Sequence, residues 1–102
     1  MISIEIKNMI PKICEYFSTQ PIEKAWLFGS CSRGEETQNS DIDILVEYKK
    51  GARISLFVIA KISIDLENIL SRSVDLIEKG CLLPFAVESA EHDKILIYER
   101  AA

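Results

Sequence analysis

Hydrophobic positions along the chain alternate between helical and strand spacing. Positions 6, 10, 13 and 17 fall on one side of a first helix that ends before residue 21, and because of Pro11 this helix either kinks there or starts just before it. The expected order after this helix is strand 25–28, short helix 32–37, strand 42–48, helix 54–71, strand 74–78, helix 84–94 and strand 95–99. Strands that alternate with helices predict an α/β (α+β) fold, with a mixed sheet of about four strands flanked by helices.

The expected helix 54–71 carries two apolar stripes, separated by polar positions. The first stripe consists of Val58, Ile59, Ile62, Leu66, Ile69 and Leu70, and the second consists of Leu56, Phe57, Ala60 and Ile64. One stripe is expected to face the sheet. The other needs a different cover, because large exposed apolar patches usually mark interaction surfaces. The second stripe therefore predicts a protein–protein interface in a homo- or hetero-oligomer, unless neighbouring helices of the same chain cover it.

Length and charge limit the classes of protein to which the chain can belong. Its 102 residues are expected to form a single domain, residues 1–102, with one modest core. A formal net charge of −4 argues against a nucleic-acid coat protein, because phosphate binding needs an excess of Lys and Arg. No apolar stretch approaches the ~18 residues needed to cross a bilayer, and no signal peptide is visible, so a cytoplasmic location is expected. The cysteines are far apart, which argues against a disulfide framework or a structural zinc site.

Two aspartates alternate with isoleucines where a buried strand is expected, in the stretch LFGSCSRGEETQNSDIDILVEY, residues 27–48. Burying an ionised carboxylate is costly unless a cation or hydrogen-bond donors accompany it. Asp41 and Asp43 project to one face of the strand, and Asp75 is flanked by apolar residues in the strand 74–78. If these two strands are neighbours, the carboxylates converge, and divalent cations would relieve their repulsion. The alternative is that loop N–H groups or Arg33 satisfy carboxylates at the strand ends.

The same stretch offers groups that suit phosphate. Carboxylate oxygens bind Mg²⁺, and two Mg²⁺ ions about 3.5–4 Å apart stabilise the attacking and leaving oxygens of a phosphoryl displacement. Gly29 permits close approach of the backbone to a ligand. Ser30 offers a hydroxyl and an N–H at the start of the short helix, and Arg33 can contact a phosphate or pair with a carboxylate. Together these residues predict a cradle for a metal-bound triphosphate.

These motifs resemble those of the polymerase-β-like nucleotidyltransferase superfamily, and most closely its minimal nucleotidyltransferase (MNT) branch. The resemblance rests on GSCSRG at 29–34, on SDID at 40–43 and on Asp75 after a helix. In element order it covers essentially the whole chain, and Ser32 stands where the motif commonly has Ala. It implies the polymerase-β-like fold and the transfer of a nucleoside monophosphate from an NTP to a hydroxyl, with release of pyrophosphate.

The resemblance also implies roles for individual residues. Asp41 and Asp43 would bind two Mg²⁺ ions, and Asp75 would bind the catalytic ion and help to deprotonate the attacking hydroxyl. The residues implied in nucleotide binding are Gly29, Ser30, Arg33 and Ser40.

Stand-alone proteins that look like this chain are commonly antitoxins encoded beside HEPN-domain ribonuclease toxins. The implied function is transfer of AMP from ATP to a tyrosine on such a toxin, which neutralises it. Two alternatives remain: a catalytically silent antitoxin that masks its partner, and a nucleotidyltransferase that acts on a small-molecule acceptor. Binding of Mg²⁺ and ATP distinguishes the silent antitoxin from the enzymes, and activity on a free acceptor identifies the third class.

Overall fold

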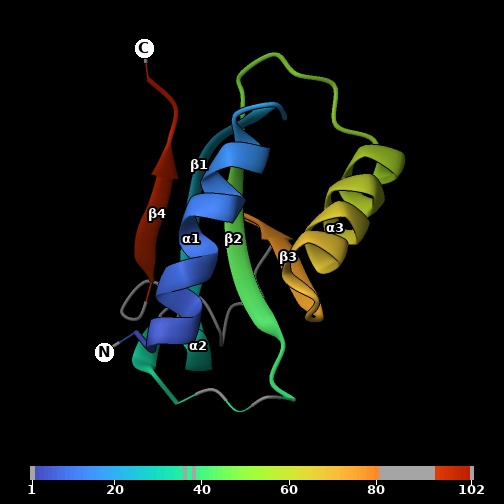
Figure 1. Ribbon diagram of the computed structural model, residues 1–102. Helices are drawn as coiled ribbons and strands as arrows, with labels where there is room; N and C mark the ends of the chain where they lie inside the picture. Colours follow the sequence, from blue (N-terminus) through green and yellow to red (C-terminus); the bar gives the residue numbers. More distant parts are fainter. Residues whose placement is uncertain (1, 36, 38, 81–93, 102) are drawn as a thin grey trace.

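The protein folds around a four-stranded mixed sheet with strand order β3-β2-β1-β4 (Figure 1). The computed structural model describes residues 2–35, 37, 39–80 and 94–101. Its elements are α1 (Ile4–Phe17), β1 (Ile22–Phe28), α2 (Ser30–Arg33), β2 (Ile42–Tyr48), α3 (Leu56–Leu70), β3 (Val74–Glu78) and β4 (Ile95–Glu99). β1 pairs antiparallel with β2 and β4, while β2 and β3 are parallel. The predicted fold class is confirmed.

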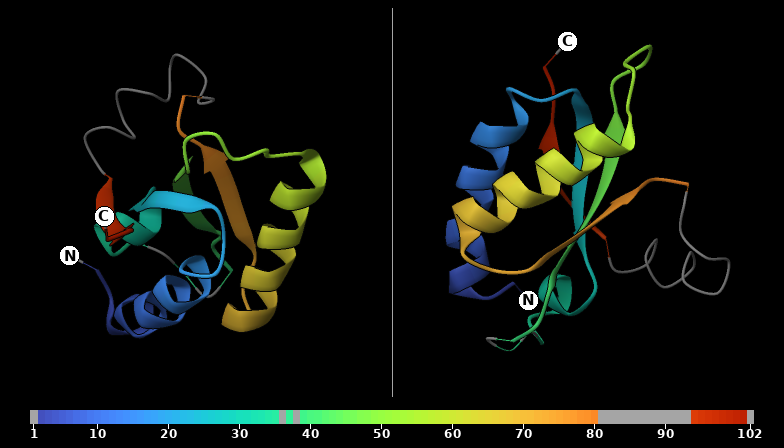
Figure 2. Two further views of the ribbon diagram at one scale, coloured as in Figure 1. Left: turned by 90° about the horizontal axis from the view of Figure 1, so that it is seen from above. Right: turned by 90° about the vertical axis from the view of Figure 1, so that its right-hand side faces the viewer.

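One face of the sheet carries both long helices, α1 and α3 (Figure 2). Successive side chains of a strand point to opposite faces, so alternate residues of β2 point toward these helices. Ile42, Ile44 and Val46 are fully buried there. The residues that complete this core come from α1, β1, α2 and α3: Ile6, Ile13, Phe17, Ile22, Ala25, Leu27, Cys31, Ile62, Leu66 and Leu70.

Ser3 fixes the start of α1. Its side chain accepts a hydrogen bond from the N–H of Ile6 at 3.2 Å, which satisfies one of the unpaired donors of the first turn. Pro11 lies inside this helix, so the alternative start just before the proline is wrong. Proline removes one helical hydrogen bond, and burial of Ile13 and Phe17 in the core offsets that loss.

The short helix α2 differs from its predicted bounds of 32–37. It begins directly after Gly29 and ends at Arg33, because Gly34 adopts a left-handed conformation (φ 73°) and donates its N–H to the carbonyl of Ser30. β1 likewise begins earlier than predicted, at Ile22, because pairing with β2 extends to that residue. The predicted helix 84–94 lies outside the described residues except for its last position, which is not helical.

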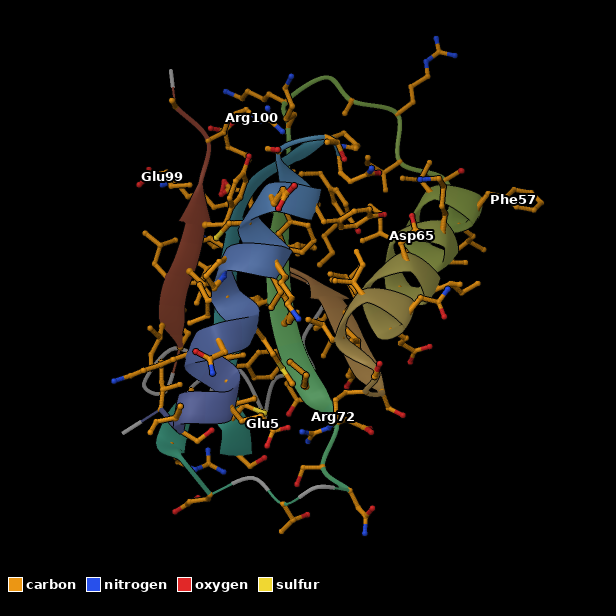
Figure 3. All side chains as sticks on the ribbon, viewed as in Figure 1. Glu5, Phe57, Asp65, Arg72, Glu99 and Arg100 are labelled. Atoms are coloured by element: carbon orange, nitrogen blue, oxygen red, sulfur yellow. The ribbon has the colours of Figure 1, made fainter. Side chains whose placement is uncertain are left out.

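The two stripes of α3 have different environments. Ile62, Leu66 and Leu70 are buried against the sheet and α1. Ile69 is 38% exposed, so its predicted place in the buried stripe is wrong. The second stripe, which we call the apolar strip, consists of Leu56, Phe57, Ala60 and Ile64. Its members are all exposed, and Phe57, at 88% exposure, projects away from the rest of the fold (Figure 3).

None of the helices in the described part of the chain is both long enough and apolar enough to span a membrane.

Candidate active site

The parallel pairing of β2 with β3 places two aspartates side by side. Asp43 and Asp75 are Cα partners in this pairing. Across the antiparallel pairing with β1, Asp43 lies opposite Phe28, the last residue of β1. Because Asp43 alternates with the buried Ile42 and Ile44, its side chain points to the face of the sheet opposite α1 and α3. The predicted neighbourhood of the two aspartate-bearing strands is therefore confirmed.

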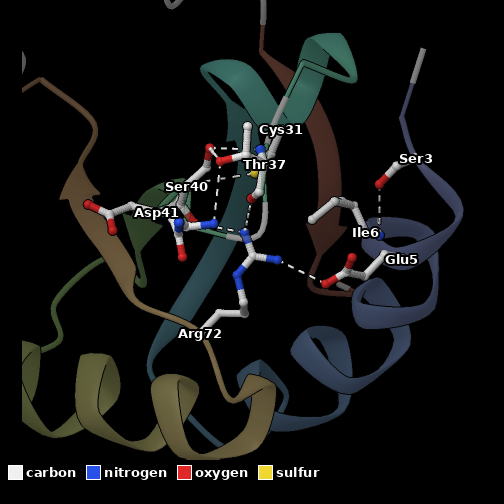
Figure 4. Close-up of polar contacts among 9 residues, drawn as sticks. Ser3, Glu5, Ile6, Cys31, Thr37, Ser40, Asp41 and Arg72 are labelled. Atoms are coloured by element: carbon white, nitrogen blue, oxygen red, sulfur yellow. Dashed lines mark hydrogen bonds and ion pairs between the residues drawn. The ribbon is translucent and has the colours of Figure 1, made fainter.

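Asp41 immediately precedes β2 and completes what we call the acidic cluster: Asp41, Asp43 and Asp75. Asp41 and Asp75 are exposed, and only Asp43 is half-buried. The prediction that the aspartates are buried is therefore wrong for Asp41 and Asp75. Asp41 lies outside the strand, and Asp75 lies on the edge strand β3. In Figure 4, the Asp41 carboxylate points away from the guanidinium of Arg72.

The environment of Asp43 disfavours its charged form. Partial burial raises its pKa, and the negative charges of Asp75 and Asp41 raise it further. The positive charge of Arg33 acts in the opposite direction. The net effect raises the pKa of Asp43 from its ordinary 3.8 to about 6. The charges of the acidic cluster are thus close enough to interact, and a perturbed carboxylate of this kind is typical of functional sites.

This raised pKa predicts that the contribution of Asp43 to the stability of the free protein decreases as the pH rises from 3.8 to about 6. Within this window the native state holds the Asp43 proton more tightly than the unfolded chain does, so deprotonation favours unfolding. Thermal unfolding of wild type and Asp43→Asn across the window measures the effect as a difference in Tm. We expect the Tm of Asp43→Asn to increase relative to that of wild type as the pH rises. A difference in Tm that stays constant across the window would contradict the raised pKa.

Gly29 lies against the Asp43 carboxylate. A Cβ atom at Gly29 would stand 2.3 Å from Oδ2 of Asp43, closer than real Cβ contacts. The backbone of Gly29 also has φ 71° and ψ −153°, a region that is essentially restricted to glycine. The carbonyl of Gly29 accepts bonds from the N–H of Ser32 at 3.1 Å and from its hydroxyl at 2.7 Å. Ser32 therefore stabilises the turn that brings Gly29 to the acidic cluster.

The other residues implied in nucleotide binding have partners within the fold. Arg33 forms an ion pair with Glu35 at 2.6 Å, although its charge also acts on Asp43. The hydroxyl of Ser40 accepts a bond from the N–H of Thr37 at 2.9 Å. Ser30 is half-buried at the first position of α2. These bonds involve only part of the hydrogen-bonding capacity of each side chain, and nucleotide contacts by Arg33 and Ser40 stay predictions.

The donor set around Asp43 fits a divalent cation by its chemistry and charge. Within the described ranges, no three His, Cys, Asp or Glu side chains are already arranged to hold a metal ion. The acidic cluster nevertheless offers only carboxylate oxygens, which Mg²⁺ prefers as protein ligands. Burial is the largest cause of the raised pKa of Asp43, and the repulsion by Asp75 and Asp41, which raises it further, is what a cation would relieve.

Sequence reasoning missed Arg72, which contacts the loop before Asp41. Its guanidinium donates to the carboxylate of Glu5 and to the carbonyls of Thr37 and Ser40. These partners lie 67, 35 and 32 positions away in the chain, so no local pattern could have indicated them.

Comparisons with known proteins agree with this geometry. The family model described as "Polymerase beta, Nucleotidyltransferase" matches residues 11–102. Two proteins of Methanocaldococcus jannaschii are similar to this chain over 95 residues. "Putative protein adenylyltransferase MJ0126" is 40% identical and "Putative protein adenylyltransferase MJ1379" is 36% identical. Each of these matches covers 91% of this chain and 95% of the relative.

Solved structures show the same fold. A structure described as a "putative minimal nucleotidyltransferase" gives a TM-score of 0.76 at 25% identity, over 93% of this chain and 95% of that chain. A toxin–antitoxin crystal structure with AMP-PNP gives 0.71 at 22% identity, over 96% of this chain and 75% of that chain. A structure of the tri-AMPylated Shewanella oneidensis HEPN toxin in complex with MNT antitoxin gives a TM-score of 0.62 at 19% identity, over 92% of this chain and 70% of that chain.

The two toxin–antitoxin structures share the fold alone, at these low identities. The family match and the two archaeal relatives, in contrast, extend over nearly the whole chain. The chain therefore belongs to the polymerase beta nucleotidyltransferase family.

Proposed function

We propose that this protein transfers AMP from ATP to a tyrosine hydroxyl of a HEPN ribonuclease toxin and neutralises the toxin as its antitoxin. The observation that carries the proposal is the acidic cluster on β2 and β3 beside Gly29. The names of the relatives at 40% and 36% identity support a protein acceptor. The structural neighbour that contains an AMPylated HEPN toxin supports this class of partner.

In the proposed reaction, the acceptor oxygen forms a bond to the α-phosphorus of ATP, and the bond from that phosphorus to the leaving pyrophosphate breaks. Asp75, exposed beside Asp43, accepts the proton of the hydroxyl. Asp41 and Asp43 would hold both Mg²⁺ ions, and Asp75 would hold the catalytic ion. When bound, such ions stabilise the charge on the attacking and leaving oxygens. Gly29 and Ser30 bind the triphosphate, and the absence of a Cβ at Gly29 leaves the Asp43 carboxylate accessible.

The decisive experiment uses the protein encoded by the neighbouring reading frame as acceptor. The purified chain, the acceptor and Mg-ATP are incubated together, and intact-mass analysis detects the gain of an adenylyl group. Peptide mapping then identifies the modified side chain. We expect modification on tyrosine, together with loss of the acceptor's ribonuclease activity.

The double variant Asp41→Asn/Asp43→Asn separates the proposal from its alternatives. Under the proposal, this variant neither modifies nor neutralises the toxin. If wild type leaves the toxin unmodified while the double variant still neutralises it, the protein is a silent antitoxin that acts by masking. If wild type adenylylates only free small acceptors, the proposed acceptor is wrong.

We further propose that the HEPN toxin covers the apolar strip of α3. Leu56 is 84% exposed, Phe57 88% and Ile64 57%, and the described part of the chain offers them no cover. An exposed apolar patch of this kind is typical of an interaction surface, in which a few large side chains contribute most of the affinity. A surface on α3 also leaves the acidic cluster accessible, because α3 lies on the opposite face of the sheet.

Phe57→Glu is therefore expected to weaken binding to the toxin by about 30-fold or more, since the loss of a central aromatic contact typically costs at least ~2 kcal/mol. Calorimetric titration of the toxin with each variant measures the affinity. Ile4→Glu is the matched control, because Ile4 is 77% exposed at the start of α1 and lies outside the strip. We expect this control to bind like wild type. Equal affinities for wild type and Phe57→Glu would exclude the strip as the interface.

A further inference from the structure

Arg72 lies in the connection between α3 and β3, and its guanidinium joins three separate parts of the chain (Figure 4). Nη1 donates to Oε1 of Glu5 in α1 at 2.9 Å. Nη2 donates to the carbonyl of Thr37 at 2.9 Å and to that of Ser40 at 2.7 Å. The Arg72 side chain is only 11% exposed, and its bond to Ser40 is partly buried, whereas its bonds to Glu5 and Thr37 lie at the surface.

The two carbonyls belong to the loop that leads directly to Asp41. Arg72 thus fixes the peptide on the N-terminal side of Asp41. On its other side, the N–H of Ile42 donates to the carbonyl of Ser73 at 2.9 Å. Two consecutive residues of the α3–β3 connection therefore hold Asp41 from both flanks, while its carboxylate remains directed away from Arg72 (Figure 4).

The same connection leads into the strand that carries Asp75. The N–H of Val74, the first residue of β3, donates to the carboxylate of Glu67 in α3 at 3.1 Å. The connection is thus anchored to α3 just before Asp75. One short segment, residues 71–75, therefore fixes the positions of Asp41 and Asp75 relative to each other.

We infer that Arg72 is a positioning residue for nucleotidyl transfer: its guanidinium fixes the loop before β2 so that Asp41 is held beside Asp43 and Asp75. This inference rests on the proposed function of the acidic cluster. Arginine suits the task because its planar guanidinium carries five donors, which can satisfy a carboxylate and two carbonyls at once. Lysine would retain the charge without that planar geometry, so Arg72→Lys should restore the function only in part.

Arg100 provides a matched control at the opposite end of the sheet. Its guanidinium also bonds to backbone carbonyls, those of Ile22 at 3.0 Å, Phe17 at 3.2 Å and Gln20 at 2.6 Å. It therefore fixes the α1–β1 loop as Arg72 fixes the loop before β2. Arg100→Gln and Arg72→Gln both remove a guanidinium that bonds to carbonyls, but only Arg72 is connected to the acidic cluster.

The test compares wild type, Arg72→Gln, Arg72→Lys and Arg100→Gln without any partner protein. Calorimetric titration with AMP-PNP in the presence of Mg²⁺ measures the affinity of the site. Removal of a residue that orients metal ligands typically lowers affinity roughly 10–100-fold, and this is the loss we expect for Arg72→Gln. We expect a smaller loss for Arg72→Lys and wild-type affinity for Arg100→Gln.

Hydrogen exchange at the backbone amide of Ile42 gives a second readout that needs no ligand. The two variants are compared under conditions in which their free energies of unfolding are equal. The Ile42 amide should then exchange at least about tenfold faster in Arg72→Gln than in Arg100→Gln, because one charged hydrogen-bond donor no longer restrains the loop. If Arg72→Gln and Arg100→Gln have the same affinity for AMP-PNP and the same exchange rate at the Ile42 amide, Arg72 has only a structural role and the inference is overturned. If wild type binds no AMP-PNP with Mg²⁺, the proposed function fails instead, and the exchange rates still decide whether Arg72 fixes the loop. If Arg72→Gln does not fold, the same two comparisons are made with Arg72→Lys.

Discussion

Asp43→Asn is expected to lower kcat for AMP transfer by about 10³-fold or more, without loss of stability. Asparagine keeps the shape of the side chain but removes the negative charge that a divalent cation needs. The same charge is unfavourable in the free protein, because partial burial, Asp75 and Asp41 together raise the pKa of Asp43 to about 6. Above that pH the variant should therefore unfold at the same Tm as wild type or at a higher one. Transfer rates with Mg-ATP and thermal unfolding of the same preparations measure the two effects.

Asp65→Asn is the matched control, because Asp65 is a carboxylate with the opposite role. It accepts bonds from the hydroxyl of Tyr16 and from the ammonium of Lys61, and the bond from Tyr16 contributes most to the lowered pKa of Asp65. Asp65 lies on α3, on the face of the sheet opposite the acidic cluster. We expect Asp65→Asn to lower Tm and to keep wild-type kcat. An active Asp43→Asn, or an inactive but folded Asp65→Asn, would contradict the assignment of the site.

The strands that carry the acidic cluster could be predicted because their signals are local. The observed bounds of β2 and β3 agree with the predicted ranges 42–48 and 74–78. Both strands are short apolar runs that end where polar residues or glycine begin, and both contain the side-chain alternation of a sheet. The alternation alone placed Asp43 on the face opposite Ile42 and Ile44, and the parallel pairing then brought it beside Asp75.

The features that the sequence did not reveal depend on contacts between distant residues. The exposure of Asp41 and Asp75 depends on where β2 begins and on which strand lies at the edge of the sheet. The contacts of Arg72 join α1, the loop before β2 and the α3–β3 connection, so they exist only in the folded chain. The early end of α2 could have been predicted from Gly34, because glycine commonly terminates a helix in the left-handed conformation.

Gly29→Ala tests the close approach of the turn after β1 to the acidic cluster. We expect this variant to lower kcat by about 100-fold, because a displacement of ~1 Å at a reacting group reduces the rate by this much. The added Cβ would lie 2.3 Å from Oδ2 of Asp43, so either the turn or the carboxylate must move. The backbone conformation adds strain, because φ 71° and ψ −153° suit only glycine and cost other residues on the order of 1–3 kcal/mol. Kinetic assays and thermal unfolding should therefore both report a loss.

Gly51→Ala separates these two causes. Gly51 also has a positive φ, 81°, but a Cβ there would meet no atom within 4 Å. This control should therefore show the conformational strain as a lower Tm while keeping wild-type kcat. The part of the Gly29→Ala effect that exceeds the control then measures the contact with Asp43. If the two alanine variants lost activity equally, the proximity of Gly29 to Asp43 would have no catalytic significance, and the turn after β1 would be only a structural connection between β1 and α2.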